Sequence, residues 1–388
     1  MTDAIDIAAD ARARFARFDL ARVPSPCFVI DEAAIERNCR ILAAVAEASG
    51  AQVFLALKAF SMPAAAPAVM RHLSGTAASG IFEARLGREV FGGHVATFNA
   101  GYKAADMPAI LANSDHVIFN SPGQFRRFRD LVAASAASPG LRINPEHSEG
   151  WTEKYDPAAP CSRLGTPVSR IEPADLDGIE GLHMHTLCEQ GFEPLARTWA
   201  AVEPVIGPWL KQMRWLNLGG GHHITMPDYD RAGLIALVRD IRARHGVEVY
   251  LEPGEAVALH AGILVGEILD LTWNGMALAI TDISATCHMP DVIEAPFRPA
   301  LLGEGTEGDP VRLGGPSCLA GDVIGDYRPA TPWAVGDRFA FLDQAIYSMV
   351  KTNTFNGVPL PAIALWNSDT DDLRLVRQFG YDDFLERL

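Results

Sequence analysis

Short apolar segments alternate with longer amphipathic segments from about residue 50 to residue 253. The intervening stretches, such as residues 122–135, 192–210 and 230–246, repeat apolar positions at helical spacing. Each of eight apolar segments has the length and composition of a buried strand: residues 53–58, 76–79, 95–99, 116–120, 141–144, 181–185, 214–218 and 249–253. Eight strands that are each followed by a helix predict an α/β fold, a TIM-like (β/α)8 barrel whose active site lies on the loops after the strands.

The pattern changes after residue 255. Strand-like segments at residues 261–271, 277–285, 310–318 and 337–350 are separated by Gly, Pro and Asp turns, without long helices between them. They predict a second, β-rich domain of sandwich or barrel type. An N-terminal strand at residues 27–30 precedes a helix that Asp31 would cap and Gly50 would end, and we expect this strand to join the β-rich domain. The expected boundaries are 1–45 for the N-terminal strand and helix, 46–255 for the barrel and 256–388 for the β domain.

Composition narrows the range of partners. The chain has 388 residues, 48% of them hydrophobic, which suffices for a large core. Its 33 basic and 48 acidic residues give a net charge of −15, which argues against nucleic acid or an anionic membrane as the partner. The N-terminal stretch lacks the apolar region of a signal peptide, and we expect a cytoplasmic protein. The six cysteines lack the CxxC spacing of a zinc site and do not suggest a disulfide framework.

Four segments with chemically active residues follow predicted barrel strands. They are "ALKA" with Lys58, "HMHT" with two histidines, "LGGG" and "EPGEA" with two glutamates. Each alone has an ordinary structural explanation: a solvated strand end, a satisfied rim histidine, a tight turn or a loop acid. On a barrel, however, all four would meet at one face, because the strands are parallel.

The four segments together predict a pyridoxal 5′-phosphate site. A glycine-rich turn exposes backbone N–H groups to a phosphate, and a lysine in apolar surroundings keeps a neutral, nucleophilic amine. A carboxylate beneath the ring can hold the pyridine nitrogen protonated. A metal site built from His183, His185, His222 and His223 is the competing hypothesis. It leaves Lys58 and the glycines unexplained, and we expect no metal.

The chain resembles the fold type III pyridoxal phosphate enzymes, which include alanine racemase and the ornithine and diaminopimelate decarboxylases. The resemblance covers nearly the whole chain and is carried, in the family's order, by "ALKA", "HMHT", "LNLGGG", "EPGEA", "GGPSCLAGD" and "QAIYS". Within that family "GLHMHTLCE", "LNLGGGHH", "EPGEA" and "ATCHMPDV" are most similar to the carboxynorspermidine decarboxylases, which also accept carboxyspermidine.

The resemblance implies a role for each matching residue. Lys58 would carry the cofactor covalently, His185 would stack on its ring and Glu252 would pair with its ring nitrogen. Cys318 would supply a proton to the active site of a partner subunit, which implies a homodimer with shared sites; by itself this cysteine would equally fit a buried structural thiol. The phosphate would be bound by Gly219, Gly220, Gly221 and Tyr347.

Two departures from the family pattern bear on the substrate. Glu255 stands where the larger decarboxylases have the arginine of "EPGR", which argues against a substrate with a distal carboxylate. Leu319 stands where an acid usually follows the cysteine, so the distal amine must be recognised by other groups. Asp291 is the main candidate for binding the substrate, with Glu252, Glu255, Asp282 and His288 as further candidates. On so acidic a chain, any one acid also fits an ordinary surface charge.

The sequence thus predicts a carboxy-lyase that converts carboxynorspermidine or carboxyspermidine to norspermidine or spermidine in polyamine biosynthesis. Three alternatives remain: another fold III decarboxylase acting on diaminopimelate, ornithine or arginine, a racemase, or a non-catalytic carrier of pyridoxal phosphate. The thiol of "GPSC" favours proton donation over racemisation, and a second domain has no use in a carrier.

Overall fold

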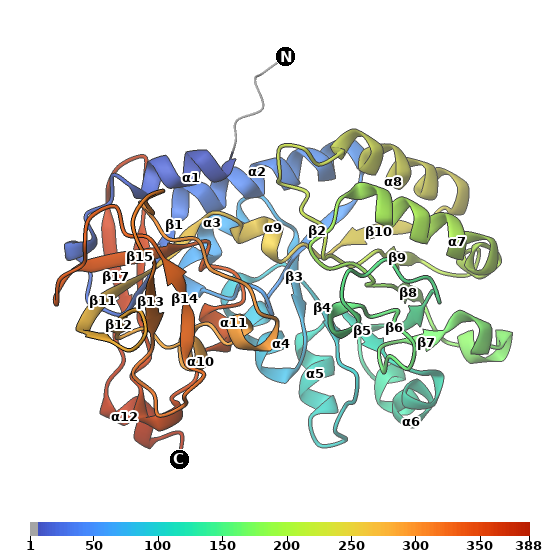
Figure 1. Cartoon of the computed structure of the whole chain (residues 1–388). Coiled ribbons are helices and arrows are strands. Elements are labelled where there is room, and N and C mark those ends of the chain that lie inside the picture. Colours follow the sequence, from blue (N-terminus) through green and yellow to red (C-terminus); the bar gives the residue numbers. More distant parts are fainter. Residues whose placement is uncertain (1–6) are drawn as a thin grey trace. The chain divides into compact units, whose positions relative to one another are not determined.

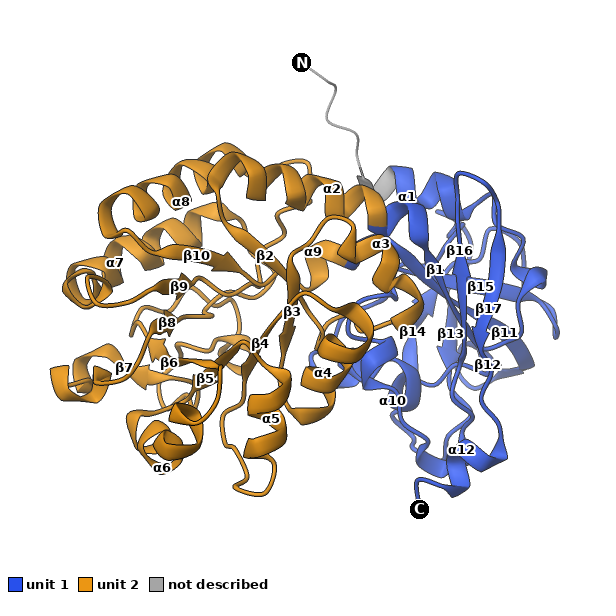
Figure 2. Ribbon diagram, turned by 180° about the vertical axis from the view of Figure 1, so that it is seen from behind, with its two compact units in different colours: residues 1–35, 258–388 blue, residues 36–257 orange. Residues whose placement is uncertain are grey.

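The computed structural model describes residues 7–388, with side chains described from residue 10. The first six residues of the stretch used to predict the absence of a signal peptide lie outside this range. The described chain divides into two compact units (Figure 2): residues 36–257 form one, and residues up to 35 together with 258–388 form the other. Within residues 7–388, no helix has the length and apolar character needed to cross a membrane.

Residues 36–257 contain a closed ring of eight parallel strands (Figure 1). Pairing of β5 with β6 closes the ring, and the order of strands around it is β5, β4, β3, β2, β10, β9, β8, β6. The strands are β2 (Gln52–Ala56), β3 (Gly75–Ala78), β4 (His94–Phe98), β5 (His116–Phe119), β6 (Ser138–Asn144), β8 (Gly181–His183), β9 (Trp215–Asn217) and β10 (Glu248–Leu251). The predicted barrel is confirmed. The prediction missed only β7 (Thr166–Pro167), a short strand on the edge of β6.

Helices precede the first barrel strand, connect the strands and follow the last one. They are α2 (Glu32–Ser49), α3 (Ala66–Met70), α4 (Ile81–Leu86), α5 (Met107–Asn113), α6 (Pro122–Ala133), α7 (Phe192–Leu210), α8 (Arg231–His245) and α9 (Glu255–Ala258). Their ends follow local chemistry: Asp230 accepts a hydrogen bond from the Gly233 amide at 2.8 Å to start α8, and Gly246 ends it in a left-handed conformation. Shorter helical turns are η2 (Pro63–Ala65), η3 (Gly87–Phe91), η4 (Glu153–Tyr155), η5 (Val168–Arg170) and η6 (Pro173–Leu176).

Trp215 fills the barrel interior opposite two glycines. It is 2% exposed and clusters with Phe54, Tyr250 and smaller side chains of the neighbouring strands. A Cβ at Gly181 would lie 1.9 Å from the indole ring, and one at Gly140 would lie 2.3 Å from it. One large side chain therefore occupies the space that the two glycines of β6 and β8 leave open.

The second unit is built on a mixed sheet. Its strands are β1 (Cys27–Asp31), β11 (Gly262–Trp273), β12 (Ala277–Thr281), β13 (Val311–Gly314), β14 (Val323–Tyr327), β15 (Arg338–Leu342), β16 (Ala362–Trp366) and β17 (Leu373–Arg377). The N-terminal strand β1 lies between β11, to which it is antiparallel, and β16, to which it is parallel. This confirms that the N-terminal strand joins the β-rich domain. The sequence did not reveal β14, β16 or β17.

The long strand β11 serves two sets of neighbours. Its first half pairs with β1 and β15, and its second half pairs with β12, which continues to β13 and β14. The helical segments of this unit are short: α1 (Ile7–Phe15), η1 (Leu20–Arg22), α10 (Ala285–His288), α11 (Asp291–Glu294), η7 (Met349–Lys351), η8 (Phe355–Gly357) and α12 (Tyr381–Leu385).

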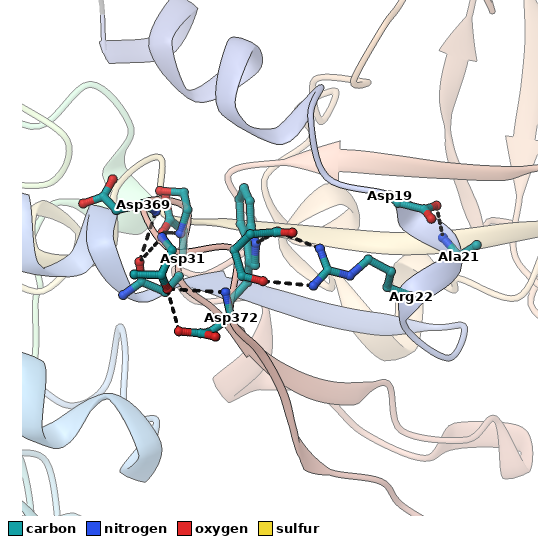
Figure 3. A network of polar contacts seen from close by, with 11 residues as sticks. Asp19, Ala21, Arg22, Asp31, Asp369 and Asp372 are labelled. Atoms are coloured by element: carbon teal, nitrogen blue, oxygen red, sulfur yellow. Dashed lines mark hydrogen bonds and ion pairs between the residues drawn. The ribbon is translucent and has the colours of Figure 1, made fainter.

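Polar contacts fasten the N-terminal segment to the turn between β16 and β17 (Figure 3). Arg22 Nη1 donates to Asp371 Oδ1 at 2.6 Å. The buried Asp31 accepts from the Ala33 amide at 3.1 Å and from the Ser368 amide at 3.2 Å through the same oxygen. Asp31 therefore caps the start of α2, as predicted, and also holds the end of β1 beside the 367–372 turn.

Candidate active site

Lys58 lies two residues beyond the end of β2, in a turn rather than in the strand itself. Its Nζ is 3.4 Å from His185 Nε2. The side chain reaches solvent, but the surrounding protein excludes much of the water around it. This desolvation, and then the positive charge of Arg142, lower the pKa of Lys58 below its ordinary value. The environment thus favours the neutral amine, which is the nucleophilic form.

His185 follows β8 and faces two candidate groups at once. Its Nδ1 accepts a hydrogen bond from the Gly220 amide at 2.9 Å, so the ring proton of the neutral form resides on Nε2, toward Lys58. Burial, followed by the charges of Lys58 and Arg142, places the pKa of His185 well below its ordinary value. The ring is therefore neutral at physiological pH.

The glycine turn after β9 packs so closely that side chains have no room. Gly219 and Gly221 have φ angles of +71° and +82°, which favour glycine. A Cβ at Gly220 would lie 2.0 Å from the Glu252 carbonyl oxygen. The Gly219 amide donates to Asn217 Oδ1 at 2.8 Å and the Gly220 amide to His185, whereas the Gly221 amide has no hydrogen-bond partner within residues 7–388. The Gly221 amide is thus the donor that the turn leaves available to an anion.

Glu252 follows β10 and is held by two side chains. Asn217 Nδ2 donates to Glu252 Oε1 at 2.7 Å, and His183 Nε2 lies 3.3 Å from Glu252 Oε2. Burial by itself would raise the pKa of Glu252, but His183, Asn217 and Lys58 outweigh it and lower the pKa below its usual value. The carboxylate, only 12% exposed, is therefore kept ionised inside the barrel.

These groups fit pyridoxal phosphate by the chemistry of each end. The available Gly221 amide suits a phosphate oxygen, the ionised Glu252 suits a protonated ring nitrogen, and the Lys58 amine suits an aldehyde. All three belong to the barrel unit and come from loops that follow strands. This is the face on which barrel enzymes place their active sites.

Comparison with known proteins decides the family. The family model described as "Pyridoxal-dependent decarboxylase, C-terminal sheet domain" matches residues 27–345. The chain belongs to the pyridoxal-dependent decarboxylases. Dependence on pyridoxal phosphate and decarboxylase activity, both predicted from the sequence motifs, are thereby confirmed.

Similar proteins cover nearly the whole decarboxylase. The chain is 41% identical over 374 residues to the carboxyaminopropylagmatine decarboxylase of Synechocystis sp. (95% of this chain and 96% of the relative). It is 38% identical over 377 residues to the carboxynorspermidine/carboxyspermidine decarboxylase of Campylobacter jejuni (94% and 98%). The crystal structure of the Campylobacter jejuni carboxynorspermidine decarboxylase with norspermidine superposes with a TM-score of 0.87 at 36% identity, covering 94% of this chain and all of the other.

Sequence reasoning missed several polar residues inside the decarboxylase barrel. Arg142 on β6 is 4% exposed, donates to the His185 carbonyl at 3.0 Å and lies 4.4 Å from the ring centroid of Phe98. Burial lowers the pKa of Arg142 to about 10, so it stays a cation. Asn217 was also missed. The available signals were an arginine within the apolar run "LRIN" and an asparagine directly before "LGGG".

The four histidines of the metal hypothesis have separate partners. His183 pairs with Glu252 and His185 lies beside Lys58, as described above. His222 Nδ1 lies 2.6 Å from the Tyr229 hydroxyl, and burial lowers the pKa of His222 to about 3. His223 Nε2 lies 2.9 Å from Glu255 Oε2 at the start of α9. Among residues 7–388, no group of three or more His, Cys, Asp or Glu side chains is placed to hold a metal ion.

The other candidates belong to the sheet unit. His288 is fully buried; its Nδ1 accepts from the Ser284 amide at 3.2 Å and its Nε2 lies 3.0 Å from the Pro359 carbonyl oxygen. Burial lowers the pKa of His288 to about 4. Both ring nitrogens are engaged within the fold, so substrate binding by His288, which stays a prediction, would require one of these contacts to be released.

Each of the remaining candidates in the sheet unit has a contact within the fold. Asp282 accepts a hydrogen bond from the Glu267 amide at 2.9 Å, and desolvation raises its pKa. Asp291 forms an ion pair with Lys351 Nζ at 2.6 Å. Tyr347 has a φ angle of +55° and lies under the Lys351 ammonium, 5.5 Å from the ring centroid. Cys318 is exposed, and its backbone amide donates to Asn356 Oδ1 at 2.6 Å.

Proposed function

We propose that this decarboxylase removes the carboxylate of carboxynorspermidine or carboxyspermidine and releases norspermidine or spermidine as a step of polyamine biosynthesis. The observation that carries the proposal is the barrel group of Lys58, His185, Glu252 and the glycine turn. It occurs in a chain that aligns over 94% of its length with a relative of that specificity. The structure of the Campylobacter jejuni enzyme with norspermidine supports the same class of substrate.

The residues of the barrel divide the chemistry among them. Pyridoxal phosphate, when bound, supplies a sink for the electron pair that remains when the carboxylate leaves as carbon dioxide. The Lys58 amine would hold the aldehyde carbon of the cofactor, and desolvation lowers the pKa of Lys58 in favour of the neutral, nucleophilic form. Glu252, held ionised by His183 and Asn217, would hold a proton at the ring nitrogen. His185 would cover a face of the cofactor ring and the glycine turn would bind the phosphate; Tyr347 is our proposal, from the family motif, for a further phosphate ligand.

We further propose a homodimer in which the partner subunit's Cys318 supplies the proton that replaces the carboxylate. An exposed thiol supports this assignment, since a buried structural cysteine would be inaccessible to another subunit. Mixing inactive Lys58→Ala chains with inactive Cys318→Ala chains tests the arrangement. Recovery of part of the activity is expected, because a mixed dimer contains one site with both residues intact. No recovery, or a monomer in solution, would contradict it.

Substrate amines need acidic partners. Glu255 is 10% exposed, pairs with His223 and stands where an arginine would favour a carboxylate. We propose Glu255, Asp282 and Asp291 as the amine-binding residues. At Asp291 an incoming ammonium would replace the Lys351 ammonium that now pairs with it. Replacing Asp291 by Asn should therefore raise KM for the triamine more than it lowers kcat.

Carboxyaminopropylagmatine is a second candidate substrate, favoured by the 41% identity to the Synechocystis enzyme. Its agmatine end carries a guanidinium, whereas the carboxylated triamines end in an ammonium. Carbon dioxide release should be measured from both triamines, carboxyaminopropylagmatine, diaminopimelate, ornithine and arginine. We expect the highest kcat/KM with carboxynorspermidine or carboxyspermidine. A higher value for the guanidinium substrate would replace our proposal with the second candidate, and a higher value for an amino acid would reject both.

We also propose a cytoplasmic location. The chain has six cysteines, and the structure contains no disulfide within residues 7–388, as is usual for proteins of reducing compartments. Cell fractionation with detection of the native protein measures this directly, and recovery in a secreted or envelope fraction would contradict it.

A further inference from the structure

Asn217 is the last residue of β9, and its side chain is completely buried. In the register of the sheet it lies opposite His183 of β8 and Tyr250 of β10. Side chains of paired residues in a sheet point to the same face. Asn217 thus lies with the inward-facing residues, at the end of the strand where the glycine turn begins.

Both ends of the Asn217 amide are occupied. The oxygen accepts from the Gly219 amide at 2.8 Å, and the nitrogen donates to Glu252 Oε1 at 2.7 Å. This orientation is required chemically, because a flipped amide would place two donors together at Gly219 and two acceptors together at Glu252. The side chain therefore connects the phosphate-side turn with the acid of the ring-nitrogen side.

A backbone contact closes this connection into a ring. The Glu252 amide donates to the Gly219 carbonyl at 2.7 Å, so three hydrogen bonds join Asn217, Gly219 and Glu252. The close packing at Gly220, where a Cβ would lie 2.0 Å from the Glu252 carbonyl oxygen, leaves little freedom for the turn to move against Glu252. His183, opposite Asn217, supports the other carboxylate oxygen at 3.3 Å.

We propose that Asn217 is a positioning residue that holds the glycine turn and Glu252 at a fixed separation. This separation would let one ligand place its phosphate at the turn and its ring nitrogen at Glu252 at the same time. The inference rests on the proposed function, which places the phosphate at the glycine turn and the ring nitrogen at Glu252. Asn217 itself is not expected to touch the reacting atoms.

Three ligands separate the two ends of the site. They are pyridoxal 5′-phosphate, pyridoxal, which lacks the phosphate, and the analogue of pyridoxal 5′-phosphate in which carbon replaces the ring nitrogen. Dissociation constants are measured on the full-length apoprotein by equilibrium dialysis. The ratio of the pyridoxal constant to the pyridoxal phosphate constant is the phosphate ratio. The ratio of the dissociation constant of the carbon analogue to that of pyridoxal phosphate is the ring ratio.

Two substitutions of Asn217 have different expected effects. Asn217→Leu removes donor and acceptor together and should lower both ratios, each about tenfold, the usual size of a hydrogen bond involving a charged partner. Asn217→Asp keeps an acceptor for the Gly219 amide but sets a carboxyl against Glu252. It should lower the ring ratio and leave the phosphate ratio within about twofold.

Asn144→Leu is the matched control, because Asn144 is another buried asparagine at the end of a barrel strand. Its Oδ1 accepts from the Glu146 amide at 2.9 Å, without contact to the glycine turn or Glu252. Both ratios should stay within about twofold of those of the unaltered protein. Circular dichroism and thermal unfolding establish which variants are folded. If Asn217→Leu does not fold, Asn217→Asp decides, and an unchanged ring ratio in that variant overturns the inference.

The outcomes distinguish failure of the inference from failure of the proposed site. If Asn217→Leu weakens all three ligands equally, both ratios are unchanged, the role is merely structural and the inference is rejected. A fall in only one ratio rejects the linking role. If the unaltered protein itself binds pyridoxal as tightly as pyridoxal phosphate, then the placement of the phosphate at the glycine turn is wrong.

Discussion

Strand β9 begins with Trp215 and ends, two residues later, with Asn217, and these two side chains belong to opposite ends of the barrel. Around Trp215 the contacts are aromatic: His116 stacks on the indole at 4.3 Å between centroids and 8° between planes, and Phe54 stacks on His94 at 4.9 Å. Around Asn217 the contacts are polar and directed, as they are for Glu252. The first end is organised by shape and the second by hydrogen bonds.

The histidines at the two ends also differ in their hydrogen-bond partners. His116 Nδ1 and His94 Nε2 are buried without a hydrogen-bond partner within residues 7–388, and burial lowers the pKa of His116 to about 3. At the other end, His183 Nδ1 also lacks a partner within residues 7–388, but His183 Nε2 faces Glu252 and both nitrogens of His185 have neighbours. Burial lowers the pKa of histidines at both ends, His183 and His185 included, but at the polar end the ring nitrogens also orient Glu252, Lys58 and the glycine turn. We expect substitutions at the two ends to separate folding from activity.

The largest expected effect is the loss of activity in Lys58→Ala. Removal of the amine should reduce carbon dioxide release by roughly 10²–10⁴-fold or more, the usual contribution of a positioned proton-transfer or nucleophilic group. The midpoint of thermal unfolding should change little, because the Lys58 side chain is solvent-accessible.

Two measurements check this prediction. Lys103→Ala, which removes an exposed lysine of the same unit, serves as the control and should retain activity. Borohydride reduction of the protein with its cofactor, followed by peptide mapping, should label Lys58. A label on another lysine would contradict the assignment of Lys58 as the lysine that binds the cofactor.

Trp215→Ala tests the aromatic end. Removing a buried indole leaves a cavity between Gly140 and Gly181, and we expect the free energy of unfolding to fall by about 3–5 kcal/mol. Urea titration of the apoprotein measures the loss. Trp151→Ala is the control, since that side chain is 82% exposed and its removal should change stability by less than about 0.5 kcal/mol. Equal effects of both substitutions would contradict the interior role of Trp215.

His116→Phe should change how stability depends on pH. Below the ordinary histidine pKa of 6.5, the unfolded chain binds a proton that the folded chain, with a pKa of about 3, excludes. Stability therefore decreases by about 1.4 kcal/mol per pH unit as the pH falls from 6.5 toward 3. Phenylalanine retains the stacking and lacks this term, so between pH 7.5 and 5 the variant should lose about 2 kcal/mol less than the unaltered protein. Parallel pH profiles from urea unfolding would refute this explanation.

The smallest expected effect is that of Tyr250→Phe. The Tyr250 hydroxyl donates to Glu248 Oε2 at 2.6 Å on the partly solvated side, and its loss should lower the free energy of unfolding by about 1 kcal/mol. The ring contacts to Phe54 and His94 remain, and carbon dioxide release should be unchanged. A clear loss of activity in this variant would show that the two ends of the barrel are not separable.

Much of the barrel could be predicted because its strands and helices have local patterns. The amphipathic pattern of residues 192–210 coincides with α7 despite two prolines inside the helix. By contrast β16 was missed, since its stability derives from pairing with β1, more than 330 residues earlier in the chain. Sheets assembled from such distant segments leave little signal in any one segment.

The candidate site shows the same division. Lys58, Glu252 and the glycine turn could be found because their motifs recur in a recognisable order. Asn217 could not, since its role depends on which strands become neighbours in space and on the contacts of its two amide atoms. His288 illustrates the same limit of motifs, because a motif position does not reveal that the imidazole ring will be buried and hydrogen-bonded to backbone groups of its own unit.

The short length of β9 has a consequence for insertions and deletions. Successive side chains of a strand point to opposite faces, so sliding β9 by one residue would bring Leu216 into the barrel and turn both Trp215 and Asn217 outward. A single inserted residue that was absorbed by such a slide would damage the core and the cofactor site together. Insertions and deletions must therefore be accommodated in the loops on either side of β9. β9 itself is a poor site for an inserted segment and should be left unchanged when loops of the active site are redesigned.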